Sequence, residues 1–164
     1  MVKKWQIRLI IWIVCLGVIF PLQGCTGKME EIRVGVNLEL SGMLAQYGRA
    51  CQQGIELAVE EQNSKGGIHG KKIVLRQADN RSQNYDSAVC AQRLVDIEGC
   101  IALIGPSTSG GVKSELLRDL GVPVIVPSAT SDTLLPERMQ QNPMFRICYT
   151  DTAQGKAMAE YSYT

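Results

Sequence analysis

The sequence predicts an α/β fold, with a doubly wound, mainly parallel sheet and helices on both faces. Two patterns carry this prediction. Short apolar segments with the character of strands alternate along the chain with longer segments in which apolar residues recur at helical spacing. One short segment, IALI at 101–104, is apolar throughout, which is typical of a parallel strand covered on both faces. Strands that alternate with helices in this way favour a parallel sheet.

The first strand is predicted at 32–38, IRVGVNL, and the loop SGMLAQYG follows it. A helix is expected from about 46 to 63, because apolar residues share one helical face there. This face comprises Cys51, Ile55, Ala58, Val59 and Gln62. Glycines in the following SKGGIHG tolerate the positive φ that often ends a helix. The segment KIVLRQA, at 72–78, is the second predicted strand.

The next helix is expected to be capped by Asn84 or Asp86. Its predicted apolar face comprises Ala88, Val89, Ala91, Leu94 and Val95. The third strand is IALI, and a helix from about 109 to 120 follows it and ends at Gly121.

The fourth strand is PVIV at 123–126, and MFRI at 144–147 is the fifth. Asp151 is expected to cap a last helix that starts near Thr152. In sheets of this kind ligands lie beyond the carboxyl ends of the strands, where helix N-termini present free N–H groups.

The start of the chain has the pattern of an export signal. Basic residues precede the apolar run 9–20, which is too short for a lasting membrane span. The run ends in LQGC, which resembles a bacterial lipobox, so Cys25 is the predicted lipidation site. Residues 1–24 are then a lipoprotein signal peptide, and 25–31 form a tether to a membrane. The alternative is a signal peptide followed by a coincidental cysteine.

Composition argues against several other functions. A net charge of +1 and an aromatic content of 5% offer neither a basic face nor a stacking platform for nucleic acid. The absence of a C-x-x-C motif disfavours a zinc or redox site, and no cofactor is expected. Outside the leader and position 25, the cysteines are Cys51, Cys90, Cys100 and Cys148. All but Cys100 occupy apolar positions of predicted elements, which indicates buried free thiols.

The segment GPSTSGG, at 105–111, places three small hydroxyls before a predicted helix and has three interpretations. A nucleophile elbow would need glycine where Ser109 stands, and the sole histidine, His69, has no evident partner. A phosphate-binding loop is a near miss, because two extra residues precede Lys113. No acidic residue ends an apolar strand as a magnesium-binding site of that class requires. The third interpretation is a binding site in which these hydroxyls form hydrogen bonds to a small ligand.

Five motifs, in order along the chain, resemble the N-terminal lobe of the leucine/isoleucine/valine-binding protein family. They are LSGMLAQYG, GIELAVEEQNSKGGIHGKKIVL, ALIGPSTSG, VPVIVPSAT and FRICYTDTAQG. This family comprises type I periplasmic binding proteins of ABC importers, and the resemblance covers residues 32–163. One departure is Tyr149, which stands where the family often has proline.

The resemblance implies a set of ligand-binding residues. Ser109 matches the serine that donates to the carboxylate of the ligand. The PSAT segment contributes Ser128, Ala129 and Thr130: the Ser128 carbonyl accepts from the ligand ammonium, and Thr130 offers a hydroxyl and an N–H. Tyr47 matches an aromatic residue that covers the ligand side chain. Fixed small hydroxyls and backbone groups suit a zwitterion, because they pair both of its charges without burying a charged side chain.

Each of these residues also has a purely structural interpretation. Ser107 and Ser109 could cap the helix that follows them. Thr130 and Ser131 could be ordinary loop hydroxyls. Tyr47 could be a surface aromatic packed on the helix it precedes.

The resemblance predicts that residues 32–164 form a truncated N-terminal lobe of a solute-binding protein that performs no bond chemistry. Its expected ligand is a branched-chain or other small amino acid or amide, and its expected partners are ABC permease subunits. The predicted location is outside the cytoplasmic membrane, with the lipid in the cell membrane or outer membrane. One lobe is expected to bind weakly or not at all. The rivals are a ligand-sensing receptor domain of the same fold and a P-loop-like nucleotide-binding enzyme.

Overall fold

A computed structural model describes residues 31–113, 120–134 and 143–163 of the chain. The predicted lipidation site Cys25 and the leader lie outside these residues. Five parallel strands form one sheet in the order β2-β1-β3-β4-β5. The strands are β1 (Ile32–Leu38), β2 (Ile73–Asp79), β3 (Ala102–Ile104), β4 (Val124–Val126) and β5 (Met144–Arg146). The predicted parallel sheet and the approximate place of every strand are confirmed.

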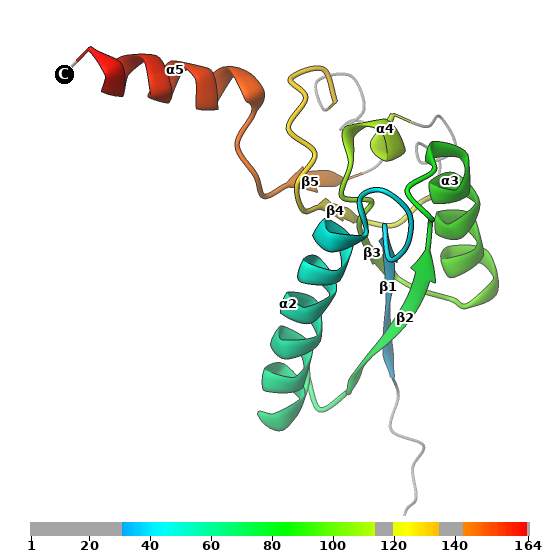
Figure 1. Cartoon of the computed structure of the whole chain (residues 1–164). Coiled ribbons are helices and arrows are strands. Elements are labelled where there is room, and N and C mark those ends of the chain that lie inside the picture. The colour runs from blue at the N-terminus through cyan, green and yellow to red at the C-terminus, as the bar shows by residue number, and fades with distance from the viewer. Residues whose placement is uncertain (1–30, 114–119, 135–142, 164) are drawn as a thin grey trace, which may run out of the picture.

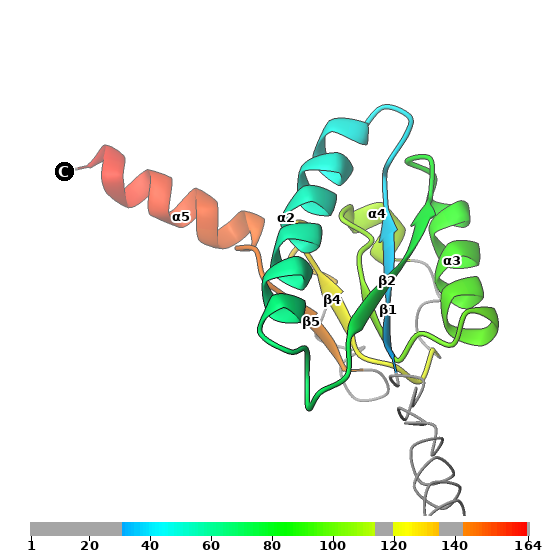
Figure 2. The ribbon, with the colours of Figure 1, turned by 90° about the horizontal axis from the view of Figure 1, so that it is seen from below.

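Helices cover both faces of the sheet, as Figures 1 and 2 show. On one side lies α2 (Ala45–Ser64), and on the other lie α3 (Asn84–Gln92) and the short α4 (Ser109–Val112). A π-helical turn, η1 (Arg93–Ile97), continues α3. The last helix, α5 (Asp151–Ser162), projects away from the sheet and has no buried residue. The helix predicted from about 109 to 120 is present as α4 over Ser109–Val112, residues 114–119 lie outside the described part, and Leu120 and Gly121 are not helical.

The core lies between the sheet and the α3 and α4 side. Leu103, Val124 and Met144 are register partners on neighbouring strands and are buried; we name them the covered row. Their neighbours Ile104, Ile125 and Phe145 are also register partners, and we name them the open row. Because side chains alternate between the faces of a strand, the open row lies on the α2 side. Phe145 is 51% exposed and Ile125 is 38% exposed, so α2 covers this face only in part.

Two predicted helix caps are wrong by one residue. Asn84 is the first residue of α3, and Gln83 occupies the cap without a side-chain hydrogen bond. Asp86 lies inside the helix. Asp151 is likewise the first residue of α5, and Thr150 is the cap, with its hydroxyl accepting from the Ala153 N–H. Thr150 has the extended backbone that a cap requires, whereas Asp151 is already helical.

Burial on the helices departs from the predicted apolar faces at several positions. Ala88, Ala91 and Leu94 are buried as expected, but Val89 is exposed, because one helical step turns it about 100° away from Ala88. On the predicted apolar face of α2, Ala58 is exposed, and Cys51, Ile55 and Val59 are half-buried rather than buried.

All four described cysteines are free thiols. Cys51, Cys90 and Cys148 are half-buried rather than buried, and the fully buried thiol is Cys100. Burial raises the pKa of both Cys90 and Cys100. Raised pKa values keep both thiols protonated and poorly reactive, so these two cysteines fit a packing role.

Candidate functional site

Three loops meet where β1, β3 and β4 end, at what we name the carboxyl edge of the sheet. The loop after β1 leads into α2 and Tyr47, the loop after β3 leads into α4 and Ser109, and the loop after β4 carries Ser128 to Thr130. All three strands point the same way, so their ends lie side by side. The structure therefore brings the five predicted ligand-binding residues to one edge.

The loop after β3 is shaped by a glycine. Gly105 has a φ of +97°, and a Cβ there would collide with the backbone oxygen of Asn37 at the end of β1. Only glycine combines this backbone conformation with so close an approach to the neighbouring strand. The Gly105–Pro106 peptide bond is cis. The chain then turns directly into the hydroxyl-bearing residues.

The three hydroxyls of this loop have different surroundings. Thr108 caps α4, because its Oγ1 accepts from the Gly111 N–H at 3.3 Å. Ser107 is buried, and its N–H donates to the carboxylate of Glu39 at 3.3 Å. Ser109 is half-buried, and its Oγ accepts from the N–H of Ser131 at 3.3 Å. The capping role that was the alternative for Ser107 and Ser109 thus falls to Thr108.

The bond that Ser109 accepts is compatible with ligand binding. A hydroxyl can accept and donate at the same time, so the proton of Ser109 can still reach an oxygen acceptor. The same bond links the loop after β3 to the loop after β4. The hydrogen bond from Ser131 therefore holds the Ser109 hydroxyl in place and leaves its proton available to a ligand.

The loop after β4 is fixed mainly through its backbone. The Ser128 hydroxyl donates to the Ser107 carbonyl at 3.0 Å. Arg146 of β5 donates to the carbonyls of Ala129, at 3.2 Å, and Ser131, at 2.7 Å. Ala129 is buried, so its side chain has no access to a ligand in solution. Ser128 is exposed and Thr130 is half-buried, so both can be reached from the carboxyl edge.

Tyr47 lies in the first turn of α2 and is 56% exposed. Its position depends on the next residue, Gly48, which is buried against the backbone of Glu39. A Cβ on Gly48 would collide with the Glu39 carbonyl oxygen. The glycine thus allows the first turn of α2, which contains Tyr47, to lie directly over the end of β1.

Asp79 is the last residue of β2, so an acidic residue does end this strand, contrary to the expectation from sequence. It anchors the loop that precedes α2. Its Oδ1 accepts from the backbone N–H groups of Leu40, Ser41 and Arg81 at 2.8–3.1 Å. Burial alone would raise the pKa of this carboxyl, but hydrogen bonds from the Ser41 side chain and from these backbone groups hold the pKa below its ordinary value. The ionised carboxylate therefore stabilises the loop that leads from β1 to Tyr47.

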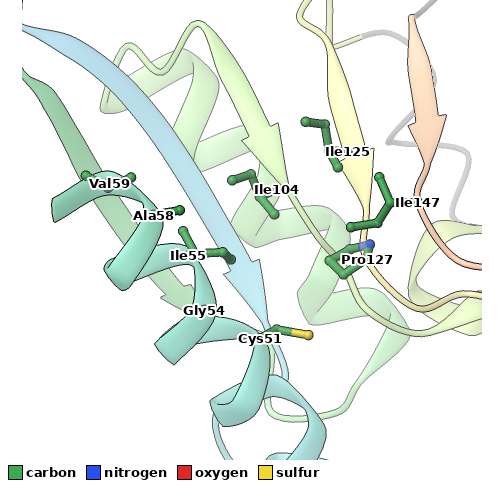
Figure 3. Close-up of a pocket in the computed structure, with 9 residues that line it drawn as sticks. All are labelled: Cys51, Gly54, Ile55, Ala58, Val59, Ile104, Ile125, Pro127 and Ile147. Atoms are coloured by element: carbon green, nitrogen blue, oxygen red, sulfur yellow. The ribbon is translucent and has the colours of Figure 1, made fainter. Parts of the chain in front are cut away.

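An apolar cavity of about 350 Å³ lies beside this edge, between α2 and the sheet. Figure 3 shows it between the α2 helix and strands β3 and β4. The lining residues are Cys51, Gly54, Ile55, Ala58, Val59, Ile104, Ile125, Pro127 and Ile147. This lining includes none of the five predicted ligand-binding residues. The cavity belongs to the partly covered sheet face, and its polar surface is too small to hold a zwitterion.

Sequence reasoning missed two charged residues that organise the carboxyl edge. Glu39 is 1% exposed and contacts the loop after β3, and Arg146 binds the loop after β4. A signal was available, because each charge lies in or next to an otherwise apolar strand segment, NLEL and MFRI. Charged residues at such positions are buried only when they are paired or hydrogen-bonded.

Within the described ranges, no three His, Cys, Asp or Glu side chains are grouped closely enough to hold a metal ion. Over the same part of the chain, no helix has both the length and the apolar character needed to cross a membrane. The exposed and half-buried groups that the carboxyl edge offers to a ligand, at Ser109, Ser128 and Thr130, are neutral hydroxyls and backbone groups.

Comparison with known proteins gives a consistent result. The family model described as periplasmic binding protein matches residues 31–164. A Leu/Ile/Val-binding protein from Rhizobium johnstonii is 33% identical over 133 residues, which is 80% of this chain and 35% of that protein. An amino acid binding protein from Pseudomonas aeruginosa is 30% identical over 138 residues, 83% of this chain and 36% of that protein.

Solved structures show the same likeness. The substrate-binding protein of a branched-chain amino acid transporter from Streptococcus pneumoniae, in complex with isoleucine, is 39% identical with a TM-score of 0.69. The match covers 75% of this chain and 35% of that one. An ABC transporter substrate-binding protein from Desulfitobacterium hafniense, in complex with Leu, is 28% identical with a TM-score of 0.70, over 80% of this chain and 38% of that one. The chain thus spans little more than a third of the length of these relatives.

Proposed function

Because this chain belongs to the periplasmic binding protein family, we propose that its carboxyl edge holds a small amino acid for an ABC importer. The observation that carries the proposal is the clustering of Ser109, Ser128 and Thr130, which come from two loops joined by hydrogen bonds. Two of the similar solved structures are complexes with isoleucine and leucine, which makes branched-chain amino acids the first ligands to test.

The proposed roles follow from the donors and acceptors available. Ser109 donates its hydroxyl proton to the ligand carboxylate, at the start of a helix that Thr108 already caps. The Ser128 carbonyl and the Thr130 hydroxyl accept from the ammonium, and the Thr130 N–H adds a donor for the carboxylate. Tyr47 covers the ligand side chain with its exposed ring. No step makes or breaks a covalent bond, so the proposed activity is binding and release.

A titration followed by NMR tests this function on the whole chain. L-Isoleucine, added into the millimolar range, is expected to shift the amide signals of the loops after β3 and β4. Two analogues sharpen the test: 3-methylpentanoic acid lacks the ammonium, and 2-methylbutylamine lacks the carboxylate. Both are expected to bind more weakly, because each leaves one set of site groups unpaired. Of the two outcomes expected for a single lobe, weak binding and no binding, the proposal requires the first. Equal shifts with all three compounds, or no shift with isoleucine at its solubility limit, would therefore contradict it.

Substitution separates ligand contact from structural support. Ser109→Ala and Thr130→Ala are each expected to weaken isoleucine binding by about 1–3 kcal/mol with little change in melting temperature. Ser64→Ala is a matched control, because the Ser64 hydroxyl only donates to the Glu61 carbonyl at the far end of α2. An equal loss of unfolding free energy in the ligand-free protein would instead assign Ser109 and Thr130 a structural role.

The proposed partners and location rest on the family and on the leader sequence. Extracytoplasmic binding proteins of ABC importers deliver ligand to membrane permease subunits, and we extend that role to this chain. Cys25 is the proposed lipid site and would hold the chain at a membrane. Mass spectrometry of membrane fractions should find a mature chain that begins at acylated Cys25. Cys25→Ser should abolish acylation, whereas Cys15→Ser, within the leader, should not. A soluble product cleaved elsewhere would rule out the anchor.

A further inference from the structure

Glu39 is a buried carboxylate at the carboxyl edge. It follows β1 directly and is 1% exposed. Removing a carboxylate from water is unfavourable unless hydrogen bonds replace the lost hydration. A buried acidic side chain next to a proposed binding site therefore needs a physical account, and its contacts supply one.

Both oxygens of the Glu39 carboxylate accept hydrogen bonds from the loop after β3. Oε2 accepts from the Ser107 N–H at 3.3 Å, and Oε1 accepts from the Thr108 hydroxyl at 3.1 Å. Thr108 Oγ1 in turn accepts from the Gly111 N–H. Because its proton is directed at Glu39, the Thr108 hydroxyl presents a lone pair to the start of α4. Glu39 thus orients the residue that caps the helix beginning at Ser109.

The same residue contacts two other segments of the carboxyl edge. Its carbonyl oxygen lies against Gly48, which follows Tyr47 in α2. Ser107, held by the Glu39 side chain, accepts from the Ser128 hydroxyl through its carbonyl. Glu39 is therefore linked to all three loops that carry predicted ligand-binding residues.

We propose that Glu39 is a positioning residue that fixes the turn formed by Ser107 and Thr108 so that Ser109 is presented to the amino acid. This inference rests on the proposed function. Glu39 acts through Ser107 and Thr108 and does not touch the ligand, in keeping with its burial. A carboxylate suits this role because it has two acceptor oxygens for the two donors.

Glutamine is the discriminating substitution, because it matches the shape of glutamate but has one acceptor oxygen and one amide donor group. In the Glu39→Gln variant the amide group would face either the Ser107 N–H or the Thr108 hydroxyl. The first arrangement opposes two donors. In the second, Thr108 Oγ1 accepts from the amide, so its proton loses its acceptor on residue 39 and the direction of the lone pair that caps α4 is no longer fixed. Either arrangement loosens the turn while nearly preserving side-chain volume.

Amide hydrogen exchange measures the turn directly, without ligand. Glu39→Gln is expected to speed exchange at Ser107 and Gly111 by about tenfold or more while core amides of β1 and β3 exchange as in the wild type. Glu61→Gln is the matched control, because Glu61 is an exposed glutamate near the end of α2. Unchanged exchange at Ser107 and Gly111, or equally faster exchange throughout the sheet, would overturn the positioning role.

A second pair of variants keeps the test valid if the Glu39→Gln protein fails to fold. Thr108→Val removes the hydroxyl at nearly constant shape, and Thr108→Ser restores it. Fast exchange at Gly111 in the valine variant and recovery in the serine variant are expected. Equal exchange at Gly111 in both variants would contradict the proposal that Glu39 orients the cap of α4 through the Thr108 hydroxyl.

The isoleucine titration then distinguishes the two hypotheses. If the wild-type chain shows no isoleucine-induced shifts, the proposed function fails, whatever the exchange data say of Glu39. If the wild type responds and the Glu39→Gln variant responds at the same concentrations, the positioning role fails and the proposed function stands. We expect the variant to need at least about tenfold more isoleucine for the same shift at Ser109.

Discussion

The two faces of the sheet are held by different kinds of interaction. On the α3 and α4 side, the covered row packs into a continuous apolar core with Leu94 and Val112. On the α2 side, Gly48 is the only buried residue of the helix, and the open row is partly exposed. On this second side, hydrogen bonds attach α2 and its preceding loop to the sheet. Asn63 makes two hydrogen bonds to the backbone of Ile73, and Asp79 accepts three from loop N–H groups.

This difference indicates where stability and site geometry each originate. Burying apolar area contributes most of the folding free energy, so the covered row should dominate stability. The polar contacts under α2 contribute less energy, but they determine where the helix begins and therefore where Tyr47 lies. The largest effects of substitution are accordingly expected in the covered row, and smaller effects under α2.

The largest expected effect is that of Leu103→Ala in the covered row. Leu103 is fully buried, so truncation removes buried methyl groups and leaves a cavity that costs about 2–5 kcal/mol of unfolding free energy. Ile125→Ala, in the open row on the neighbouring strand, should cost less than about 1.5 kcal/mol, because its side chain is already partly hydrated. Urea unfolding followed by circular dichroism measures both. Equal losses would show that the two faces are equally covered in solution.

A smaller effect is expected at Gly48, where α2 meets the end of β1. Gly48→Ala places a methyl group against the Glu39 carbonyl, which should cost about 1–3 kcal/mol as the helix is displaced. Gly54→Ala is the matched control in the same helix, because no atom lies within 4 Å of a Cβ there. Its expected effect has the opposite sign, a gain of about 0.5–1 kcal/mol from helix propensity. Thermal unfolding of the pair measures the difference, and two losses of equal size would contradict the proposed close approach at Gly48.

Asn63→Ala tests the polar attachment of α2 at its other end. The Asn63 side chain donates to the Ile73 carbonyl and accepts from the Ile73 N–H, both at 2.8 Å. Removing both bonds should cost about 1–2 kcal/mol and increase amide exchange at Ile73. Gln53→Ala, on an exposed position of the same helix, should change stability by less than about 0.5 kcal/mol. If Asn63→Ala behaves like this control, polar bonds do not hold α2 to the sheet.

The sequence predicted the sheet well because its signals are local. Alternating apolar segments and glycines placed every strand, and parallel topology then placed the loops of 105–111 and 127–130 at one edge. The predicted cap of α5 failed by one residue, because Thr150 and Asp151 are both able to cap and local propensity does not choose between them. The predicted cap of α3 failed because Gln83 holds the cap position without a side-chain hydrogen bond. The exact boundary depends on the backbone of the preceding loop.

The organisation of the site was less predictable because it depends on long-range contacts. Glu39 follows an apolar strand, and its carboxylate accepts a hydrogen bond from the N–H of Ser107, which lies 68 residues later in the sequence. The apolar neighbours Leu38 and Leu40 hint that this glutamate is buried, but nothing local indicates which groups pair with its carboxylate. The half-burial of Cys51 is similar, because it depends on how much of the open row is covered. The ligand-binding roles of Tyr47, Ser109, Ser128, Ala129 and Thr130 remain predictions, since they require a bound ligand to be tested.

The smallest expected effect is the pH dependence that Asp79 contributes on the α2 side. The pKa of Asp79 lies below its ordinary value of 3.8 in the folded chain, so folding favours the ionised carboxylate. Its contribution to stability is fully present above the unfolded pKa and is lost as the pH falls through the lower folded pKa. Asp79→Asn should therefore be less stable than the wild type near neutral pH, and the difference should shrink on acidification below the ordinary carboxyl range.

The pH series needs a control variant because Asp79 is not the only group of this kind. Hydrogen bonds from the Thr152 side chain hold the pKa of Asp132 below its ordinary value, so acid will destabilise the wild type in part through that residue. Comparing Asp79→Asn with Asp96→Asn, an exposed aspartate on η1, at each pH cancels this shared contribution. The first amides to lose exchange protection in acid should be those of Leu40, Ser41 and Arg81, which donate to Asp79. If amides of the covered row lose exchange protection at the same pH, acid destabilises the whole sheet. The hypothesis that polar bonds attach α2 independently of the core would then be wrong.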